Sequence, residues 1–376
     1  MKFGGTSIQN PSVCKRVINI IKNTSDPRKV IVFSAMGKIT RKLLALSQSY
    51  ADQKETAVKR IFQDIRSFHH TLSQSLISDS GSKKIIPLMD SYFKQIIDLG
   101  EEIQKRKKLE PRMQDRMLSY GELLSTAIMT NAMKSNGLKA SLLDSRDFII
   151  TDSSFTGAKP LIKETYEKIN IAIPSIVEKK EIPVIQGFIG SNFQGVVTTL
   201  GFEGSDLTAS LIGAALRVDE IQIWKNVSGI MTADPCICSK AKSIENITFK
   251  EAFELSKAGA KVLHPRTTTP AAEKDIPIRI KNSTRPEEIG TLISNQNITS
   301  DVSIKSIVCK IVHDKALLTL VGQGIAREKG IIQRIIIQIK DFSFTLQEDD
   351  NPDTLIFIFD KADMEKAVEL THNAVF

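Results

Sequence analysis

The sequence has few cysteines, few aromatic residues and no long apolar run. No second Cys pair or His pair stands at zinc-finger spacing around Cys236-x-Cys238, and the other two cysteines are Cys14 and Cys309. We therefore expect a reduced, cytoplasmic chain. No apolar run approaches the roughly 20 residues that cross a bilayer. The N-terminus also lacks a basic segment followed by an apolar one, so we expect no membrane partner and no secretory signal.

The charge is not concentrated in one basic surface. The 51 Lys and Arg residues are interspersed with 43 acidic residues, which gives a formal net charge of +8. The compact basic cluster Lys105 to Lys108 follows Glu101 and Glu102, which indicates a solvated helix face. Because only 6% of residues are aromatic, little is available for base stacking, and we expect no nucleic-acid partner. An anionic phosphorylated ligand such as ATP fits this charge.

Short apolar runs alternate with longer helical patterns through most of the chain, whose 376 residues favour two domains. The runs predict buried strands, and the alternation predicts an α/β domain, residues 1–295, with a mainly parallel central sheet. The predicted strands are Val30 to Ser34, Ala140 to Leu143, Ile182 to Ile189, Ile221 to Trp224 and Ile276 to Ile280. The predicted helices are Pro11 to Asn23, Arg41 to Gln74, Lys84 to Lys107, Glu122 to Asn136, Pro160 to Glu178, Asp206 to Leu216 and Lys250 to Ala258.

The pattern changes after a stretch rich in Asn, Ser and Thr, from Asn282 to Ser303, where we place the domain linker. Residues 304–376 then predict a small α+β module. Its predicted strands are Ile304 to Val312, Ala316 to Val321, Phe342 to Gln347 and Leu355 to Phe359, and its predicted helices are Ala326 to Ile339 and Ala362 to Ala374.

Two glycine-rich turns carry the chemical signal. The first is Lys2-Phe3-Gly4-Gly5-Thr6-Ser7, which precedes a predicted helix. Adjacent glycines let backbone N–H groups approach phosphate oxygens, and a lysine adds a positive charge. A Gly-Gly pair at a tight turn is also common for purely structural reasons, so this turn alone does not establish a phosphate site.

The second turn is Gly201-Phe202-Glu203-Gly204-Ser205-Asp206, which again opens a predicted helix. Ser205 and Asp206 are also good helix-capping residues, so a purely structural role for Asp206 remains an alternative. Two such turns in one α/β domain suggest two loops that face phosphate groups.

Several separated motifs, in order, resemble the aspartokinase family. They are K-F-G-G-T-S, S-A-M-G-K-I-T from Ser34, S-Y-G-E from Ser119 and T-T-L-G-x-x-G-S-D. The stretch Ile221 to Leu292, with W-K-N-V-S-G-I-M-T-A-D-P, G-A-K-V-L-H-P and R-I-K-N-S-T-R-P, is similar to the plant-like branch of that family. The resemblance implies an amino-acid-kinase-like three-layer domain followed by a module of the βαββαβ type called ACT.

The resemblance implies a kinase that transfers the γ-phosphoryl group of MgATP to the side-chain carboxylate of L-aspartate, the first step of lysine, threonine and methionine biosynthesis. The acceptor carboxylate is already a nucleophile, so no general base is needed. The implied catalytic residues are Lys2 and Asp206. The implied aspartate-binding residues are Thr6, Thr40, Glu122, Thr199 and Ser205. The implied residues of the ATP site are Lys2, Gly4, Gly5, Ser7, Lys225, Asn226, Met231, Lys261 and Val262, and no protein metal site is implied.

Several positions depart from the family pattern. Phe202-Glu203 stands where the family has Arg-Gly. In the family that arginine pairs with a substrate carboxylate, so Arg217 or Arg266 would have to compensate for its loss. Asn226 replaces an aspartate, and only Met1 precedes Lys2, so we expect a nearly absent central strand and a poorly fixed Lys2, unless the start is truncated. For Glu122 alone, a solvated glutamate at a helix start is the simpler interpretation.

The regulatory end has room for one ACT-like module, whereas this branch usually has two. We therefore expect weak or absent inhibition by lysine, and a homodimer, because such modules commonly pair through sheet edges. Two alternatives to an active kinase stay open. One is a catalytically impaired nucleotide-binding relative, and the other is an amino-acid kinase with a different carboxylate acceptor.

Overall fold

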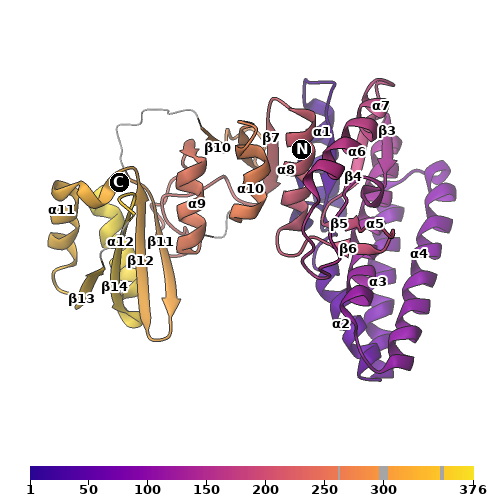
Figure 1. The fold of residues 1–376 in the computed structure, drawn as a ribbon, viewed down its shortest axis with the longest axis horizontal. Helices are drawn as coiled ribbons and strands as arrows, with labels where there is room; N and C mark the ends of the chain where they lie inside the picture. The colour runs from indigo at the N-terminus through magenta and orange to yellow at the C-terminus, as the bar shows by residue number, and fades with distance from the viewer. Residues whose placement is uncertain (261–262, 296–303, 348–350) are drawn as a thin grey trace. The chain divides into compact units, whose positions relative to one another are not determined.

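The protein forms two compact units, Met1–Asn226 and Val227–Phe376. We describe them from a computed structural model that covers residues 1–260, 263–295, 304–347 and 351–376 (Figure 1). Within these ranges, no helix is long and apolar enough to cross a membrane. The domain boundary predicted between residues 295 and 304 falls inside the second unit, between two separate sheets, and stays a prediction.

The first unit is built on five parallel strands in the order β3-β4-β2-β1-β7. These strands are β1 (Lys2–Phe3), β2 (Ile31–Phe33), β3 (Ala140–Leu143), β4 (Ile182–Gln186) and β7 (Ile221–Lys225). A small antiparallel hairpin, β5 (Ile189–Ser191) with β6 (Val197–Thr199), follows β4. The mainly parallel sheet was predicted from the apolar runs, and this prediction is confirmed.

Helices cover the sheet in two groups. Side chains alternate along a strand, and Ile31 and Phe33 of β2 belong to one core with α1, α2 and α5, whereas Val32 lies beside α8. The helices are α1 (Pro11–Asn23), α2 (Ile39–Ala51), α3 (Glu55–Leu76), α4 (Asp79–Arg106), α5 (Pro111–Ser135), α6 (Ile162–Ala172), α7 (Pro174–Val177) and α8 (Gly204–Leu216), with short 3-10 turns η1 (Gly5–Ile8) and η2 (Ser145–Asp147). In Figure 1, α2 to α5 run side by side as long helices.

Local chemistry explains where several helices begin. Asn10 accepts a hydrogen bond from the Val13 N–H at 3.1 Å and Pro11 occupies the first turn, so α1 begins where it was predicted. The predicted helix Arg41 to Gln74 is two helices, because the chain turns between α2 and α3, with Gln53 at φ 58°. The predicted helix from Glu122 is much longer than expected, since α5 begins at Pro111.

The second unit contains two sheets. The first pairs β10 (Thr291–Ser294) with β8 (Asn246–Thr248) in parallel and with β9 (Ile278–Asn282) in antiparallel orientation, beside α9 (Phe249–Ala258) and α10 (Pro265–Ala272). Thr248 and Glu251 form a capping box at the start of α9. His264 caps α10 by accepting from the Arg266 N–H at 3.2 Å, so it has a structural role.

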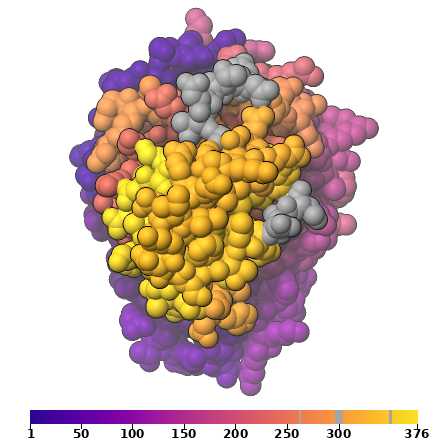
Figure 2. All heavy atoms as spheres, turned by 90° about the vertical axis from the view of Figure 1, so that its left-hand side faces the viewer, coloured from indigo at the N-terminus to yellow at the C-terminus, as the bar shows by residue number. Residues whose placement is uncertain are grey.

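The second sheet is antiparallel, in the order β11-β12-β14-β13. Its elements are β11 (Ile304–Val312), β12 (Lys315–Gly322), η3 (Ile325–Arg327), α11 (Lys329–Ile339), β13 (Phe344–Gln347), β14 (Thr354–Asp360), η4 (Lys361–Asp363) and α12 (Met364–Val375), drawn from orange to yellow in Figure 2. From β12 onward the chain follows the βαββα order, and β11 pairs with β12 at the edge where the last strand of a βαββαβ unit belongs. The predicted ACT-like module is thus formed with its edge strand supplied from upstream.

Candidate active site

A pocket of about 540 Å³ lies at the carboxyl ends of β1, β2 and β7, next to the first turn of α8. Ligands of open α/β sheets commonly bind at this edge, and a helix N-terminus favours an anion. Ten residues predicted from the sequence line it: Lys2, Gly4, Gly5, Thr6, Thr40, Glu122, Ser205, Asp206, Lys225 and Asn226. Residues more than 200 positions apart in the chain therefore meet in one site.

Lys2 is firmly held, contrary to the expectation of a poorly fixed side chain. Although β1 has only two residues, it pairs with β2 on one side and β7 on the other, and Phe3 stacks between Phe33 and Trp224. Lys2 itself is buried and forms an ion pair with Asp206. The central strand is short, but its neighbours and its core fix it.

Asp206 does not act as a simple helix cap. The residue at the cap position of α8 is Glu203, and Asp206 instead pairs with Lys2 and lies 3.3 Å from the Lys225 ammonium. Burial by itself raises the pKa of Asp206, but the two lysines outweigh it and hold the pKa below the ordinary value. The two glycine-rich turns are thus joined by a carboxylate shared between two ammonium groups.

Glu122 lies in the middle of α5 and is 3% exposed, so the interpretation as a solvated glutamate at a helix start was wrong. One carboxylate oxygen accepts from the Ala35 N–H at 2.9 Å, while the other is buried with no hydrogen-bond partner. Burial raises the pKa of Glu122 to about 8, against the opposing effects of the Ala35 hydrogen bond and the Lys2 charge. An unpartnered carboxylate oxygen lining a pocket is suited to a cationic donor.

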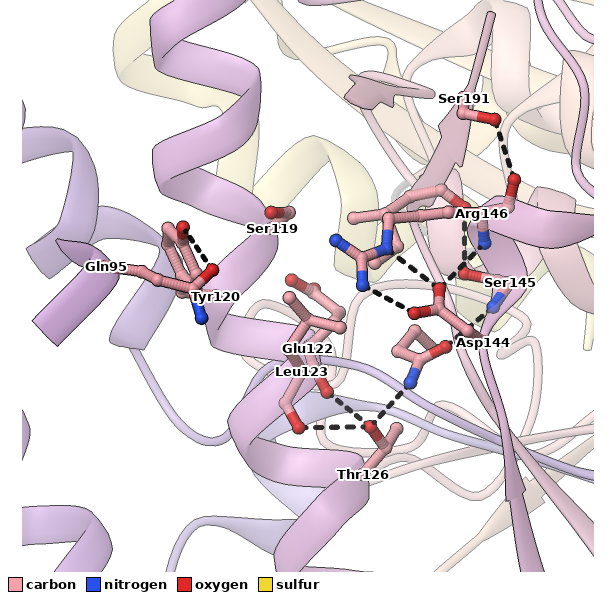
Figure 3. A network of polar contacts seen from close by, with 12 residues as sticks. Gln95, Ser119, Tyr120, Glu122, Leu123, Thr126, Asp144, Ser145, Arg146 and Ser191 are labelled. Carbon is pink, nitrogen blue, oxygen red and sulfur yellow. Dashed lines mark hydrogen bonds and ion pairs between the residues drawn. The ribbon is translucent and has the colours of Figure 1, made fainter. Parts of the chain in front are cut away.

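The helix around Glu122 is anchored to the sheet by polar contacts (Figure 3). Thr126 donates to the Glu122 carbonyl at 2.7 Å and accepts from the Gln186 amide at 3.1 Å. Gln186 in turn accepts from the Ser145 N–H at 2.8 Å. These contacts fix the rotation of α5, and with it the direction of the Glu122 side chain.

Asp115 is a site-shaping residue that the sequence analysis missed. It is buried in α5 about two helical turns before Glu122. It accepts from the Thr199 N–H at 2.9 Å, the Thr199 hydroxyl at 2.7 Å and the Thr156 N–H at 2.9 and 3.0 Å. Burial raises the pKa of Asp115, although these hydrogen bonds oppose the change. Thr199 is therefore bound to Asp115, two residues before the turn Gly201 to Gly204. Its spacing of seven residues from Glu122 was the available signal.

The glycines of the first turn are structurally constrained as well. A Cβ on Gly5 would stand 2.5 Å from the Ala35 carbonyl oxygen, and the Gly4 N–H already donates to the Trp224 carbonyl at 3.3 Å. Ser7 is buried. A phosphate role for these residues stays a prediction.

The remaining predicted residues lie elsewhere. Met231 belongs to the second unit, and Lys261 and Val262 lie outside the described residues. Arg217 follows the last residue of α8, so the length of this helix separates it from the turn with Phe202, where it was considered as compensation for the missing arginine. Arg266 lies in the second unit, and its compensation for the missing arginine stays a prediction.

The fold and the site define an α/β protein that gathers lysines and carboxylates at one pocket, at the carboxyl ends of parallel strands. The family model for the amino acid kinase family matches residues 1–282. Aspartokinase 2, chloroplastic, of Arabidopsis thaliana is 34% identical over 349 residues, which are 92% of this chain and 63% of that protein. Lysine-sensitive aspartokinase 3 of Escherichia coli K12 is 31% identical over 335 residues, which are 89% of this chain and 72% of that protein. The chain belongs to the amino acid kinase family and, within it, to the aspartokinases.

Solved structures agree with this assignment. The structure of E. coli aspartokinase III in complex with aspartate and ADP superposes with a TM-score of 0.88 at 25% identity, covering 100% of this chain and 99% of that one. Clostridium acetobutylicum aspartate kinase shares the fold, with a TM-score of 0.80. The chain spans 58 to 63% of the length of the three Arabidopsis aspartokinases that it matches.

Proposed function

We propose that this protein is an aspartate kinase, which converts ATP and L-aspartate to ADP and 4-phospho-L-aspartate, the first step of lysine, threonine and methionine biosynthesis. The observation that carries the proposal is the buried Lys2–Asp206–Lys225 ion-pair chain next to the unpartnered oxygen of Glu122. The similarity to E. coli aspartokinase III, solved with aspartate and ADP, supports the same assignment.

In the proposed reaction, an oxygen of the aspartate side-chain carboxylate attacks the γ-phosphorus, and ADP leaves. Lys2 and Lys225 would neutralise the charge of the phosphoryl oxygens, and Asp206 would keep both ammonium groups in place. Glu122 would bind the α-ammonium group of aspartate, and Thr40 and Ser205 line the same pocket. Transfer of this kind depends on positioning and charge stabilisation, so the pocket needs no general base.

Mg²⁺ would accompany the nucleotide. Among the described residues, no group of three or more His, Cys, Asp or Glu side chains could hold a metal ion. We propose that phosphate oxygens chiefly hold this cation, which would neutralise their charge. The acidic residues that line the pocket are Glu122, Glu203 and Asp206, and Asp206 is flanked by the two lysines.

The direct test is ATP-dependent formation of acyl phosphate, trapped as a hydroxamate with hydroxylamine. L-Aspartate, L-glutamate, acetate and a reaction without acceptor are compared. Product with aspartate alone supports the proposed kinase, whereas product with another acid supports a different acceptor. No product with any acceptor, while ATP still raises the melting temperature, supports an impaired nucleotide-binding relative.

One feature of the pocket is a reason to test for a different acceptor or for an impaired relative. Phe202 is 81% exposed at the pocket, where the family has an arginine, and the described lining residues include no guanidinium group. Losing a bidentate arginine contact weakens binding of a carboxylate by about 2 kcal/mol or more. A substrate with one carboxylate would be affected less than aspartate.

We also propose a homodimer in a reducing compartment such as the cytoplasm. All four cysteines are free thiols. The outer strand β13 of the C-terminal sheet is paired on one side, with β14, and its last three residues are exposed. Such an edge is suited to pairing with a second copy. Light scattering at several protein concentrations tests the assembly.

A further inference from the structure

Glu203 has an unusual backbone conformation at the mouth of the pocket. It is a non-glycine residue with φ 52° and ψ 25°, the left-handed region, in the turn between Gly201 and Gly204. L-residues other than glycine, asparagine and aspartate enter this region reluctantly, and a long side chain gains nothing locally from doing so. Although Glu203 is at the cap position of α8, its side chain makes no capping hydrogen bond. Strained backbone of this kind is concentrated at functional sites.

The strained turn places the Glu203 carboxylate against a lysine of the site. Its Oε1 lies 3.7 Å from the Lys225 ammonium, and both side chains are less than a fifth exposed. The same ammonium is 3.3 Å from Asp206, which also pairs with Lys2. Lys225 is thus shared by two carboxylates, and the four side chains form one row of alternating charge.

This row makes the pocket electrically unusual for a phosphate site. Among the described lining residues, two lysines face the carboxylates of Glu203 and Asp206, and the third acidic residue is Glu122, whose pKa burial raises to about 8. Asp206 pairs with both ammonium groups, and Glu122 is buried within α5. Glu203 lies in the turn before α8, so its carboxylate can be withdrawn without dismantling the site. Partly buried charges are weakly screened, so a carboxylate at this distance competes with any anion that approaches Lys225.

We propose that Glu203 is an internal counter-ion of Lys225, which the polyphosphate group of the nucleotide must displace. This inference rests on the proposed function, in that the anion is taken to be the phosphate chain of ATP. In the absence of nucleotide, the Glu203 carboxylate lies next to the Lys225 ammonium group. When the nucleotide binds, this carboxylate turns toward solvent. Glu203 thereby weakens phosphate binding and sets how strongly the site discriminates between anions of different charge.

The test measures dissociation constants of MgATP, inorganic tripolyphosphate and adenosine by calorimetry. The variants are Glu203→Gln, Glu203→Gly and the matched control Glu167→Gln, an exposed glutamate on α6. We expect both Glu203 variants to bind MgATP and tripolyphosphate about tenfold more tightly at low salt, and less so at high salt. Adenosine affinity should not change, and Glu167→Gln should match the unmodified protein. Adding Lys225→Met should abolish the gain, because the two side chains act as a pair.

Unchanged or weaker phosphate binding in both Glu203 variants overturns the inference, as does an equal gain for adenosine, which would indicate a change of shape. If the unmodified protein forms aspartyl hydroxamate while the Glu203 variants bind phosphate no better, the counter-ion role is wrong and the proposed kinase stands. If the unmodified protein neither binds MgATP nor gives hydroxamate with any acceptor, both proposals fail.

Discussion

Glu122 offers a sharp test, because its carboxylate is buried in α5 with one oxygen unpartnered. Its pKa is raised from 4.5 in the unfolded chain to about 8 in the folded protein. The folded protein therefore binds more protons than the unfolded chain between these values. The contribution of Glu122 to stability is fully present below pH 4.5 and is lost as the pH rises through 8. The shift corresponds to a loss of up to about 5 kcal/mol, since each pKa unit is worth about 1.4 kcal/mol.

Glu122→Gln should remove this loss, because the neutral amide keeps an oxygen for the Ala35 N–H. We expect the variant to be about as stable as the unmodified protein near pH 5 and more stable by about 2 to 5 kcal/mol at pH 9. The assay is urea unfolding followed by the fluorescence of Trp224, the single tryptophan, which lies in the core of the first unit. Glu167→Gln serves as the control for a surface glutamate and should show no such difference.

The same residue links aspartate binding to proton release. At pH 7 the Glu122 carboxyl is largely protonated before the ligand binds, and an ammonium group beside it favours the ionised form. Aspartate should therefore release close to one proton per site, measured by calorimetry in buffers of different ionisation enthalpy. In Glu122→Gln the release should vanish and the aspartate KM should rise about tenfold or more. Equal stability of the two proteins at pH 9, together with no proton release, would refute the reasoning.

Four further perturbations address other parts of the protein. Lys2→Met should lower kcat at least about a hundredfold. It should also destabilise the first unit by about 3 to 5 kcal/mol, because Asp206 would stay buried with Lys225 and without Lys2. Adding Asp206→Asn should restore stability in urea unfolding but should not restore turnover. Asp115→Asn should lower stability by about 1 to 3 kcal/mol, since its amide nitrogen cannot accept from Thr156 or Thr199, and faster proteolysis near residue 156 would report it. Thr232→Val should lower the stability of the second unit by a similar amount, because the Thr232 hydroxyl forms a hydrogen bond with His372 and accepts one from the Lys242 N–H, each at 2.9 Å. Thr232→Ser should leave stability nearly unchanged. A lysine titration of turnover should show weak or absent inhibition, and strong saturable inhibition would contradict the idea that the shortened C-terminal region has lost this response.

The sequence by itself determined the class of fold and named ten of the residues that line the pocket. Runs of Ile and Val bounded by turns predict parallel strands whatever lies around them, because such strands are buried on both faces and need little besides apolar side chains. Glycine-rich turns likewise carry their information locally. The strand predicted from Ile221 to Trp224 lies within β7 (Ile221–Lys225), and the helix Pro11 to Asn23 has the predicted bounds.

Only the tertiary structure decided which polar groups meet and what their charges do. Nothing local indicates that Asp115 holds Thr199, or that Glu203 faces Lys225, since the partners are 84 and 22 positions apart and only folding brings them together. Burial is also a property of the whole fold. The sequence around Glu122 predicts a solvated side chain. Its pKa is raised because the surrounding fold excludes water from its carboxyl group.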